Sequence, residues 1–352
     1  MAAVTTIGTR ALGLFFLLLL LLASLSTLLY NGLLDRDPSG HRDRPPAVQR
    51  NVSVLLWHWP FGRSYRLDGS ECLRMYAIDR CLLTDRRSSL PSADVVVFHH
   101  QELGAGRSAL PLDLPRPPSQ RWVWLSLEPP AHNAGLDKLS GLFNWTMSYR
   151  RDADIPVPYG ESFRGAFRPS FPPAENRSCF ASWVVSKYFP EQTRSRVYQS
   201  LRKHVPIEVY GKWNRRPLAD QKLLPTIGNC LFYLAFENSE AKDYISEKLW
   251  RNAFQAGALP VVLGPGPATY RALAPPRSFI HVADFPTAGD LAAHLKRLAS
   301  DKQAYEEYFH WQHTHGIKRY TDWRERLCQI CVKYPSLTTP KVYQDLEGWV
   351  NS

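Results

Sequence analysis

The chain has 352 residues, of which 44% are apolar, and it carries a formal net charge of +11. This length and composition are those of a globular protein with room for two domains, and they exclude a mainly disordered or fibrous chain. The positive charge favours an anionic partner, which could be nucleic acid, membrane headgroups or an anionic glycan.

The N-terminus contains a predicted membrane span. Residues 11–30, ALGLFFLLLLLLASLSTLLY, are twenty uncharged residues, the length that a helix needs to cross a bilayer. A cleaved signal peptide is the alternative, but its apolar region is usually shorter and ends at a small-residue cleavage site. We expect a cytoplasmic tail at 1–10, an uncleaved transmembrane signal anchor at 11–32 and a stem at 33–50, because 35–49 is charged and contains proline.

The flanks of this span predict its orientation. Arg10 precedes it, whereas Asp35, Arg36 and Asp37 follow it, and the slight excess of positive charge on the N-terminal side favours a cytoplasmic N-terminus and a lumenal body. Six cysteines are available for oxidation. Three N-glycosylation sequons begin at Asn51, Asn144 and Asn176. Together these features indicate the secretory pathway, where the protein would not meet nucleic acid.

The cysteines leave two kinds of site open. Six cysteines allow fifteen disulfide pairings. Cys328 and Cys331 form a CxxC motif near three histidines, so a zinc site is an alternative; the histidines are His310, His313 and His315. A single CxxC in an oxidising compartment favours disulfides, and the histidines are then a solvated helix face.

Three short apolar runs in the first half predict buried strands. They cover 52–59, 93–100 and 121–128, and they are continuous rather than alternating, as expected for a parallel sheet that is buried on both faces. Each run ends in polar residues, and ligands bind beyond the carboxyl ends of strands in open α/β sheets. These polar residues are His58, His99, His100, Glu102 and Glu128. A binding cleft is therefore predicted at this edge.

Glu128 is the strongest candidate at that edge. It follows a buried strand and precedes Pro129 and Pro130, which fix the exit of the chain from the sheet. A histidine at the end of a strand is more often a structural residue whose polar atoms are satisfied.

The second half alternates strands with helices. Residues 158–178 have no period and are interpreted as a link. After them, strands are predicted at 180–186, 207–211, 231–238 and 259–264, with helices at 191–204 and from Asp243, as N-cap, to Ala256, ended by Gly257. This pattern indicates βαβ units with a parallel sheet and right-handed crossovers.

Residues 237–248 carry dense polar chemistry between two apolar segments. A helix N-terminus with a lysine nearby suits an anion such as a phosphate. Neither GxGxxG nor GxxxxGK[ST] occurs, which argues against a dinucleotide oxidoreductase and a P-loop NTPase. A nucleotide diphosphate would need cationic side chains, and Lys248 and Arg194 are the candidates. The alternative is that Glu247 and Lys248 are solvated residues of an amphipathic helix.

The segment FYLAFENS…DYISEKLWRNAFQAGALPVVLG resembles the donor-binding motif of the α-1,3-fucosyltransferases, glycosyltransferase family 10. VVVFHHQEL, RWVWLSLEPPAH and FNWTMSYRRDADIPVPYG also resemble segments of this family, so the resemblance extends from Val52 to the C-terminus.

The resemblance implies an α/β fold of the GT-B type, in which two Rossmann-like domains have a cleft between them, preceded here by one N-terminal transmembrane helix. The N-terminal acceptor-binding domain would cover 51–165, a linker 166–178, and the C-terminal GDP-fucose-binding domain 179–352. The protein would be a single-pass type II enzyme of the Golgi membrane with a lumenal catalytic domain.

The implied reaction transfers L-fucose from GDP-fucose, with inversion, to the 3-hydroxyl of N-acetylglucosamine in N-acetyllactosamine glycans of glycoproteins or glycolipids. An α-2,3-sialylated acceptor, which gives sialyl Lewis x, is expected, and a neutral acceptor, which gives Lewis x, is the alternative. No cofactor and no metal site are implied, although Mn²⁺ could stimulate the reaction.

The resemblance also implies roles for individual residues. Glu128 would be the general base, because an inverting transfer needs a carboxylate that takes the proton of the acceptor hydroxyl. Arg194 and Lys248 would bind the diphosphate and stabilise its departing charge. Contacts to the nucleotide or fucose would come from Asn238, Tyr244 and Glu247, and acceptor-side candidates are His99, His100 and Gln101.

This chain departs from the family pattern at two positions. Lys187 stands where asparagine is usual, and it could add a cation near the diphosphate or lie in solvent. Gln101 stands where arginine or tryptophan is usual, and it bears on acceptor specificity. The tripeptide 152–154 mimics the DxD metal motif of another glycosyltransferase architecture, and we interpret it as structural.

Disulfides are expected between cysteines that are close in sequence, which are Cys72–Cys81 and Cys328–Cys331. A third is hypothesised between Cys179 and Cys230, because each introduces a strand and these two strands are adjacent in a doubly wound sheet.

Two alternatives to this function remain at the level of the sequence. A lectin-like protein would share the fold without transfer, but Glu128 together with Arg194 and Lys248 argues against it, since a binding protein needs no base opposite a diphosphate site. Another GT-B glycosyltransferase with a different sugar nucleotide is the nearer alternative.

Overall fold

The computed structural model describes residues 50–170 and 177–352. The predicted tail, the membrane anchor, almost all of the stem and the sequon at Asn176 lie outside these residues. Within the described ranges, no helix has the length and apolar character that a membrane span requires.

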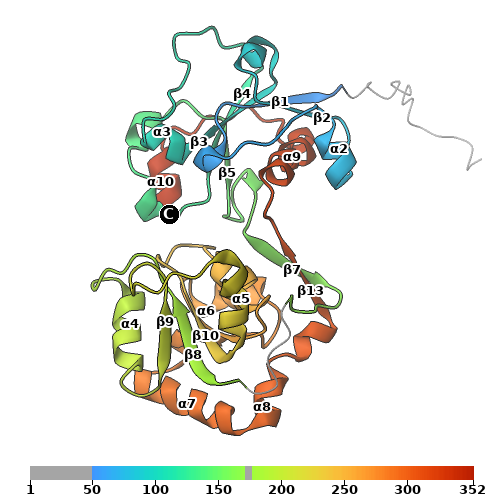
Figure 1. Ribbon diagram of the computed structural model, residues 1–352. Helices are drawn as coiled ribbons and strands as arrows, with labels where there is room; N and C mark the ends of the chain where they lie inside the picture. The colour runs from blue at the N-terminus through green and yellow to red at the C-terminus, as the bar shows by residue number, and fades with distance from the viewer. Residues whose placement is uncertain (1–49, 171–176) are drawn as a thin grey trace, which may run out of the picture. The chain divides into compact units, whose positions relative to one another are not determined.

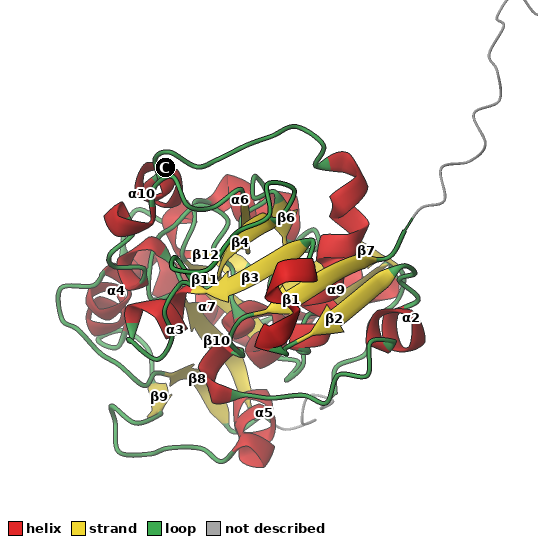
Figure 2. Ribbon diagram, turned by 90° about the horizontal axis from the view of Figure 1, so that it is seen from above, coloured by secondary structure: helices red, strands yellow, loops and turns green. Residues whose placement is uncertain are grey.

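Two parallel sheets organise the described chain (Figure 1). The first has the order β2-β1-β3-β4-β5-β6, and Figure 2 shows β2, β1, β3 and β4 side by side. Its strands are β1 (Val52–Leu56), β2 (Cys81–Thr84), β3 (Val95–His99), β4 (Arg121–Ser126), β5 (Trp145–Ser148) and β6 (Ile155–Pro156). The second has the order β12-β11-β10-β8-β9. Its strands are β8 (Cys179–Val184), β9 (Ile207–Tyr210), β10 (Cys230–Phe236), β11 (Leu259–Leu263) and β12 (Ile280–His281).

Both faces of each sheet are buried, which explains the continuous apolar runs. Along β3, Val95 and Val97 belong to one core cluster, whereas Val96 and Phe98 belong to another. Along β10, alternate residues are divided in the same way between two further clusters. The helices of the described residues are α2 (Glu71–Tyr76), α3 (His100–Gly104), α4 (Thr193–Leu201), α5 (Asp220–Gly228), α6 (Pro267–Leu273), α7 (Ala288–Ser300), α8 (Lys302–Glu307), α9 (Trp323–Lys333) and α10 (Leu346–Asn351).

The segment interpreted as an irregular link contains a strand. β7 (Gly160–Arg164) pairs antiparallel with β13 (His315–Arg319). The sequence of β7 does not alternate between apolar and polar residues, so its pairing depends on a partner about 155 residues further along the chain.

The last thirty residues belong to the first sheet and not, as predicted, to the second domain. On one face, Trp323, Leu327 and Ile330 of α9 lie in the core cluster that contains Val54. On the other face, Leu346 of α10 lies in the cluster with Leu55, Val96 and Trp124. Figure 1 shows α9, in red, beside the blue β2 and α2. The boundary at 179–352 is therefore wrong, because the chain returns after β13 to cover the sheet on which it began.

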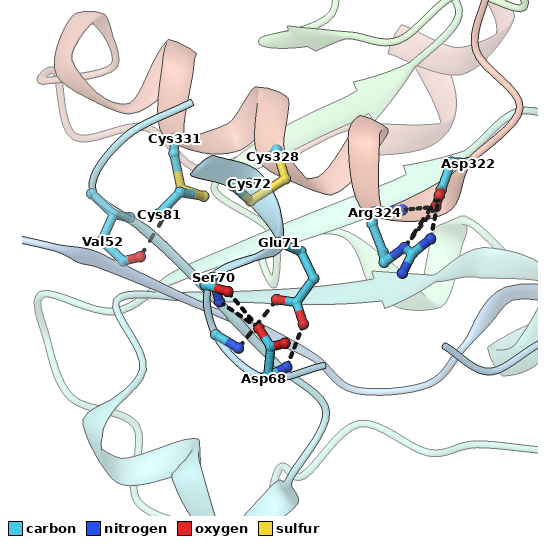
Figure 3. Close-up of a disulfide and its surroundings, with 11 residues drawn as sticks. Val52, Asp68, Ser70, Glu71, Cys72, Cys81, Asp322, Arg324, Cys328 and Cys331 are labelled. Atoms are coloured by element: carbon cyan, nitrogen blue, oxygen red, sulfur yellow. Dashed lines mark hydrogen bonds and ion pairs between the residues drawn. A yellow bond between two sulfur atoms is a disulfide. The ribbon is translucent and has the colours of Figure 1, made fainter. Parts of the chain in front are cut away.

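The disulfides follow this return of the chain (Figure 3). Cys72 pairs with Cys328 and Cys81 with Cys331, so the expected Cys72–Cys81 and Cys328–Cys331 disulfides are wrong. Residues three apart on a helix lie on the same face, and that face of α9 packs against α2 and β2, which carry Cys72 and Cys81. The sulfurs of Cys72, Cys81 and Cys328 lie within 4.8 Å of one another, but all three are in disulfides rather than free for zinc.

The third disulfide was predicted correctly. Cys179 and Cys230 are directly paired residues of β8 and β10, and a disulfide joins them with a Cα–Cα distance of 4.2 Å.

The sequon asparagine Asn144 is part of the core. Its side-chain Oδ1 accepts a hydrogen bond from the backbone N–H of Trp122 at 2.8 Å, and its Nδ2 donates to the carbonyl oxygen of Lys341 at 2.9 Å. The sequon threonine, Thr146, is also buried, and its hydroxyl contacts Asp154. The Nδ2 atom that would carry a glycan is therefore used by the fold.

We expect folded protein to carry no glycan on Asn144. A glycan on Nδ2 would break the bond to Lys341 and could not fit at a residue that is 6% exposed, so a modified chain would fail to complete the first sheet. Mass spectrometry of glycopeptides from secreted or detergent-extracted folded protein measures occupancy, with the exposed Asn51 as the comparison site. A glycan on Asn144 in folded protein would contradict this expectation.

Candidate active site

Glu128 lies just beyond the carboxyl end of β4, and its backbone is held from both sides. Its N–H donates to Ser126 Oγ at 3.1 Å, and its carbonyl oxygen accepts from Asn133 Nδ2 at 2.9 Å. Ser126 Oγ in turn donates to Asn133 Oδ1 at 2.7 Å. The Glu128 side chain is 29% exposed, so a fixed loop presents a carboxylate that solvent and ligands can reach.

His132 links Glu128 to residues on either side. Its Nδ1 lies 3.7 Å from Glu128 Oε2 and 3.4 Å from Asn238 Nδ2, and its carbonyl oxygen accepts from Gln101 Nε2 at 2.7 Å. The predicted base, the predicted acceptor-side residue Gln101 and the predicted donor-side residue Asn238 therefore meet at one histidine. His132 was not predicted as a site residue, although its position four residues after Glu128 is visible in the sequence.

The two histidines after β3 are buried. His99 is 1% exposed, and its Nδ1 lies 3.7 Å from Glu102 Oε1. Burial lowers the pKa of His99 to about 4, and it also lowers the pKa of His100. Both rings are therefore neutral at neutral pH, and they contribute shape rather than charge to the carboxyl edge of the first sheet.

The buried His99 should make stability fall in mild acid. Between its ordinary pKa of about 6.5 and the folded-state pKa of about 4, the unfolded chain binds a proton that the folded chain does not, so the free energy of unfolding decreases as the pH is lowered. The full effect is about 3 kcal/mol. We expect His99→Phe to show a shallower fall in melting temperature from pH 7 to pH 4 than the unsubstituted protein. Equal pH slopes for the two proteins would contradict this role of His99.

After β10 of the second sheet, Lys248 is held by a buried carboxylate. Its Nζ lies 2.9 Å from Glu237 Oε2, 2.8 Å from Ser246 Oγ and 3.2 Å from Glu247 Oε1, and its side chain is 15% exposed. Burial alone would lower the pKa of Lys248, but the Glu237 and Glu247 carboxylates raise it above its usual value. The ammonium group is therefore charged and fixed in position, as a phosphate-binding cation must be.

Glu237 is a site residue to which the sequence analysis assigned no role. It follows β10 directly and is buried, and its Oε1 accepts from the Ser246 backbone N–H at 2.7 Å. A Cβ at Gly264 would lie 2.9 Å from Glu237 Cγ. Any larger residue at position 264 would therefore collide with the Glu237 side chain. A glutamate at the carboxyl end of a strand, eleven residues before a lysine, was the available signal.

The helix that carries Lys248 begins later than predicted. Asp243 does not cap it: this residue has φ +60°, is buried, and accepts hydrogen bonds from the backbone N–H and Nε of Arg151 at 3.1 Å. Lys248 lies at the start of a π-helix, Lys248–Ala253, to which Glu247 is the N-cap. Tyr244 therefore precedes the helix and packs edge-on against Tyr149, with ring centroids 5.0 Å apart.

Arg194 and Lys187 differ in exposure. Arg194 is 7% exposed at the start of α4, and it donates to Gln192 Oε1 at 2.9 Å and to the carbonyl oxygen of Lys187 at 2.6 Å. Burial lowers the pKa of Arg194, and the Glu237 carboxylate opposes that shift, which places Arg194 within electrostatic range of the pair formed by Glu237 and Lys248. The side chain of Lys187 is exposed.

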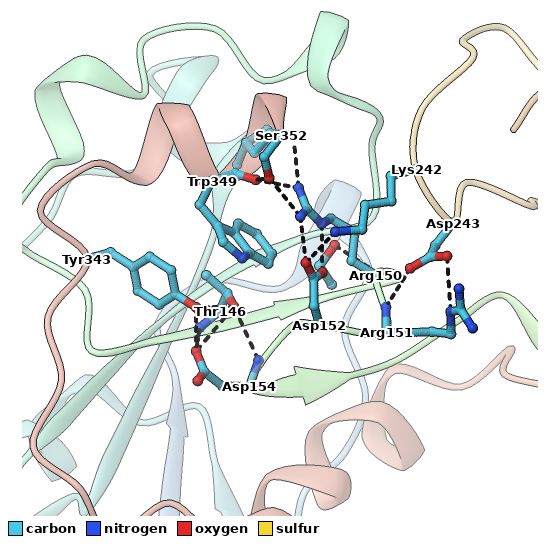
Figure 4. Close-up of polar contacts among 12 residues, drawn as sticks. Thr146, Arg150, Arg151, Asp152, Asp154, Lys242, Asp243, Tyr343, Trp349 and Ser352 are labelled. Carbon is cyan, nitrogen blue, oxygen red and sulfur yellow. Dashed lines mark hydrogen bonds and ion pairs between the residues drawn. The ribbon is translucent and has the colours of Figure 1, made fainter. Parts of the chain in front are cut away.

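Ion pairs connect the segment after β5 of the first sheet to the segment after β10 of the second (Figure 4). Asp152 binds Arg150, with 2.7 Å between Oδ2 and Nη2, and it binds Lys242 Nζ at 2.8 Å. Asp154 accepts hydrogen bonds from Thr146 and Tyr343. Both carboxylates of the DxD-like tripeptide thus serve the fold, and Asp152 joins the end of the first sheet to the loop that carries Lys242.

The chain matches two family models. "Fucosyltransferase, N-terminal" covers residues 49–160, and "Glycosyltransferase family 10 (fucosyltransferase) C-term" covers residues 174–349. The chain belongs to glycosyltransferase family 10, the fucosyltransferases. The family resemblance that the motifs predicted is therefore confirmed.

Within family 10, the chain is similar to human alpha-(1,3)-fucosyltransferase 7, with 49% identity over 305 residues, 86% of this chain and 87% of the human protein. It is 39% identical over 346 residues to bovine alpha-(1,3)-fucosyltransferase 4, with 86% and 87% of the two chains covered. A crystal structure of an alpha1,3-fucosyltransferase with GDP-fucose has the same fold, with a TM-score of 0.52, 15% identity, and 84% and 93% of the two chains covered.

Proposed function

We propose that this family-10 enzyme is an inverting α-1,3-fucosyltransferase. It transfers L-fucose from GDP-fucose to the 3-hydroxyl of N-acetylglucosamine in α-2,3-sialylated N-acetyllactosamine, which forms sialyl Lewis x. The linkage and the donor are supported by the names of the relatives and of the crystal structure to which the chain is similar. The net charge of +11 favours the anionic, sialylated acceptor.

One observation supports the proposal above the others: His132 and Asn238 join the loop of Glu128 to the loop that presents Lys248. In the proposed step, a Glu128 carboxylate oxygen takes the proton of the acceptor hydroxyl while the acceptor oxygen forms a bond to the anomeric carbon of fucose. The bond from that carbon to the β-phosphate oxygen breaks on the opposite face, and GDP leaves with the electron pair. Lys248 and Arg194 stabilise the charge that develops on the diphosphate.

The proposal includes the setting of the enzyme. The two parallel sheets correspond to the paired domains of a GT-B enzyme, with donor and acceptor in a cleft between them. Residues 11–32 anchor the enzyme in the Golgi membrane as a single-pass type II protein with a lumenal catalytic body. We propose that the reaction needs no metal, since Lys248 and Arg194 supply the cations at the diphosphate.

The test is a transfer assay with the full chain in detergent, labelled GDP-fucose, and either sialylated or unsialylated N-acetyllactosamine. Fucose transfer to the sialylated acceptor alone supports the proposal in full. Transfer to the neutral acceptor would replace sialyl Lewis x by Lewis x as the product, and Gln101 would be the first residue to examine. Binding of GDP without transfer to either acceptor would favour a lectin-like protein.

A further inference from the structure

Phe61 is an exposed aromatic residue in a strained backbone conformation. It lies in the loop after β1, its φ and ψ are 55° and 32°, and its side chain is 52% exposed. A residue with a Cβ adopts this left-handed region only at a cost in free energy, and such residues persist where the surroundings impose the conformation. A single exposed apolar side chain is ordinary. The unusual feature of Phe61 is that its neighbours hold its backbone in this conformation.

A buried carboxylate holds Phe61 in place. Glu102 Oε1 accepts a hydrogen bond from the Phe61 backbone N–H at 2.8 Å, and Glu102 is 2% exposed. Its other oxygen accepts from Arg107 Nε at 2.5 Å. Burying a carboxylate is unfavourable unless its oxygens are bonded, and here one of the two oxygens is committed to the backbone of the strained residue.

The Phe61 ring also packs against two buried aromatic rings. It meets the buried His99 ring edge-on, with centroids 4.9 Å apart, and it lies 6.4 Å from the buried ring of Trp323. Trp323 belongs to α9, the helix that returns to the first sheet. One side of the ring is therefore fixed by aromatic neighbours, and the other side is presented to solvent.

Phe61 is on the same edge of the sheet as Glu128. β1 and β4 are both neighbours of β3 and all run parallel, so their carboxyl ends are two strand spacings apart, roughly 10 Å. The elements between them are connected: Gln101, next to Glu102, donates to the carbonyl oxygen of His132, whose ring contacts Glu128. A glycan whose reacting sugar lies at Glu128 can therefore extend its neighbouring sugar along this edge toward Phe61.

We propose that the exposed face of Phe61 is an aromatic platform for the acceptor, packing against the sugar next to the N-acetylglucosamine whose hydroxyl reacts at Glu128. The inference rests on the proposed function for the identity of the acceptor. The apolar C–H face of a pyranose matches an aromatic ring, and a ring that is fixed before binding loses little conformational entropy when a sugar packs on it. Phe61 is then a determinant of acceptor specificity and has no part in binding the donor.

The test compares Phe61→Asn and Phe61→Trp with the unsubstituted full chain. Asparagine tolerates a positive φ, so Phe61→Asn removes the ring and keeps the backbone, whereas Phe61→Trp keeps an aromatic face. We expect Phe61→Asn to raise the KM for α-2,3-sialylated N-acetyllactosamine roughly 3- to 10-fold, with an unchanged KM for GDP-fucose. Phe61→Trp should restore the KM for the sialylated acceptor.

An unchanged KM for the sialylated acceptor in Phe61→Asn, or an equal rise in the KM for GDP-fucose, would overturn the platform. Saturation-transfer NMR of α-2,3-sialylated N-acetyllactosamine in the presence of GDP gives a second readout that needs no turnover. Loss of the signal in Phe61→Asn supports the contact even for a chain that transfers no fucose, which would count against the proposed function alone. Equal signals in the two proteins would overturn the contact and leave the proposed function intact.

Discussion

Glu128→Gln is expected to lower kcat roughly 10²- to 10⁴-fold, the contribution that general base catalysis typically makes. The amide has the shape of the carboxylate but cannot take the proton of the acceptor hydroxyl. The hydrogen bonds that hold this loop come from the backbone of Glu128 and from Ser126 and Asn133, so the substitution leaves them in place. Steady-state kinetics with saturating GDP-fucose and acceptor measures kcat, and calorimetry measures the affinity for GDP, which should not change.

Glu306→Gln is a suitable control for that measurement. Glu306 is an exposed carboxylate on α8 whose ion pair is with Lys302 of the same helix, at 3.7 Å, and its loss should leave kcat unchanged. A Glu128→Gln enzyme with ordinary turnover would remove Glu128 from the mechanism. A parallel loss of GDP affinity would instead indicate that the substitution acts through His132 on the loop that carries Asn238.

Lys248→Met is expected to weaken GDP binding and to destabilise the protein at the same time. In the proposed mechanism the substitution removes a cation that binds the diphosphate, and it also leaves the Glu237 carboxylate buried with hydrogen bonds from Ser246 but without its counter-charge. Removing one member of a buried ion pair typically lowers the free energy of unfolding by about 3–5 kcal/mol. Chemical denaturation measures the stability change, and calorimetry measures the affinity for GDP.

The double variant Glu237→Gln with Lys248→Met separates the two effects. A neutral pair of similar volume removes the buried charge, so most of the lost stability should return, whereas GDP affinity and transfer should stay low because the cation is still missing. Recovery of GDP binding together with stability would show that Lys248 acts through the fold and does not bind the phosphates. Unchanged GDP affinity in the single variant would lead to the same conclusion.

The sheets were predictable because their cause is local. Strands buried on both faces need continuous apolar runs, and these are visible at Val95–His99 and Cys230–Phe236. The later start of the helix, at Lys248 rather than after Asp243, was not predictable, because the Asp243 side chain, of a type that normally caps helices, is used by Arg151, 92 residues earlier in the chain. Likewise, β7 becomes a strand only through its partner β13.

Some residues of the candidate site could be predicted from local patterns, and others could not. Glu128 and Lys248 are recognisable from their places at a strand end and in a helix. Glu237 and His132 acquire their roles from contacts with Lys248 and Asn238 that no local pattern encodes. The short-range disulfides failed for the same reason, since nearness in sequence is a poor guide where the end of the chain folds back onto its beginning.

The return of the C-terminus sets an order of events during synthesis. Cys72 and Cys81 emerge from the ribosome 256 and 250 residues before Cys328 and Cys331, and until then the first sheet lacks α9 and α10, which pack on its two faces. Early oxidation would join Cys72 to Cys81, so the native bonds would then require thiol–disulfide exchange once α9 arrives. A chain that stops shortly before Trp323 would therefore lack α9 and α10, and its first sheet, although synthesised first, would not be completed. All strands of the second sheet would be present.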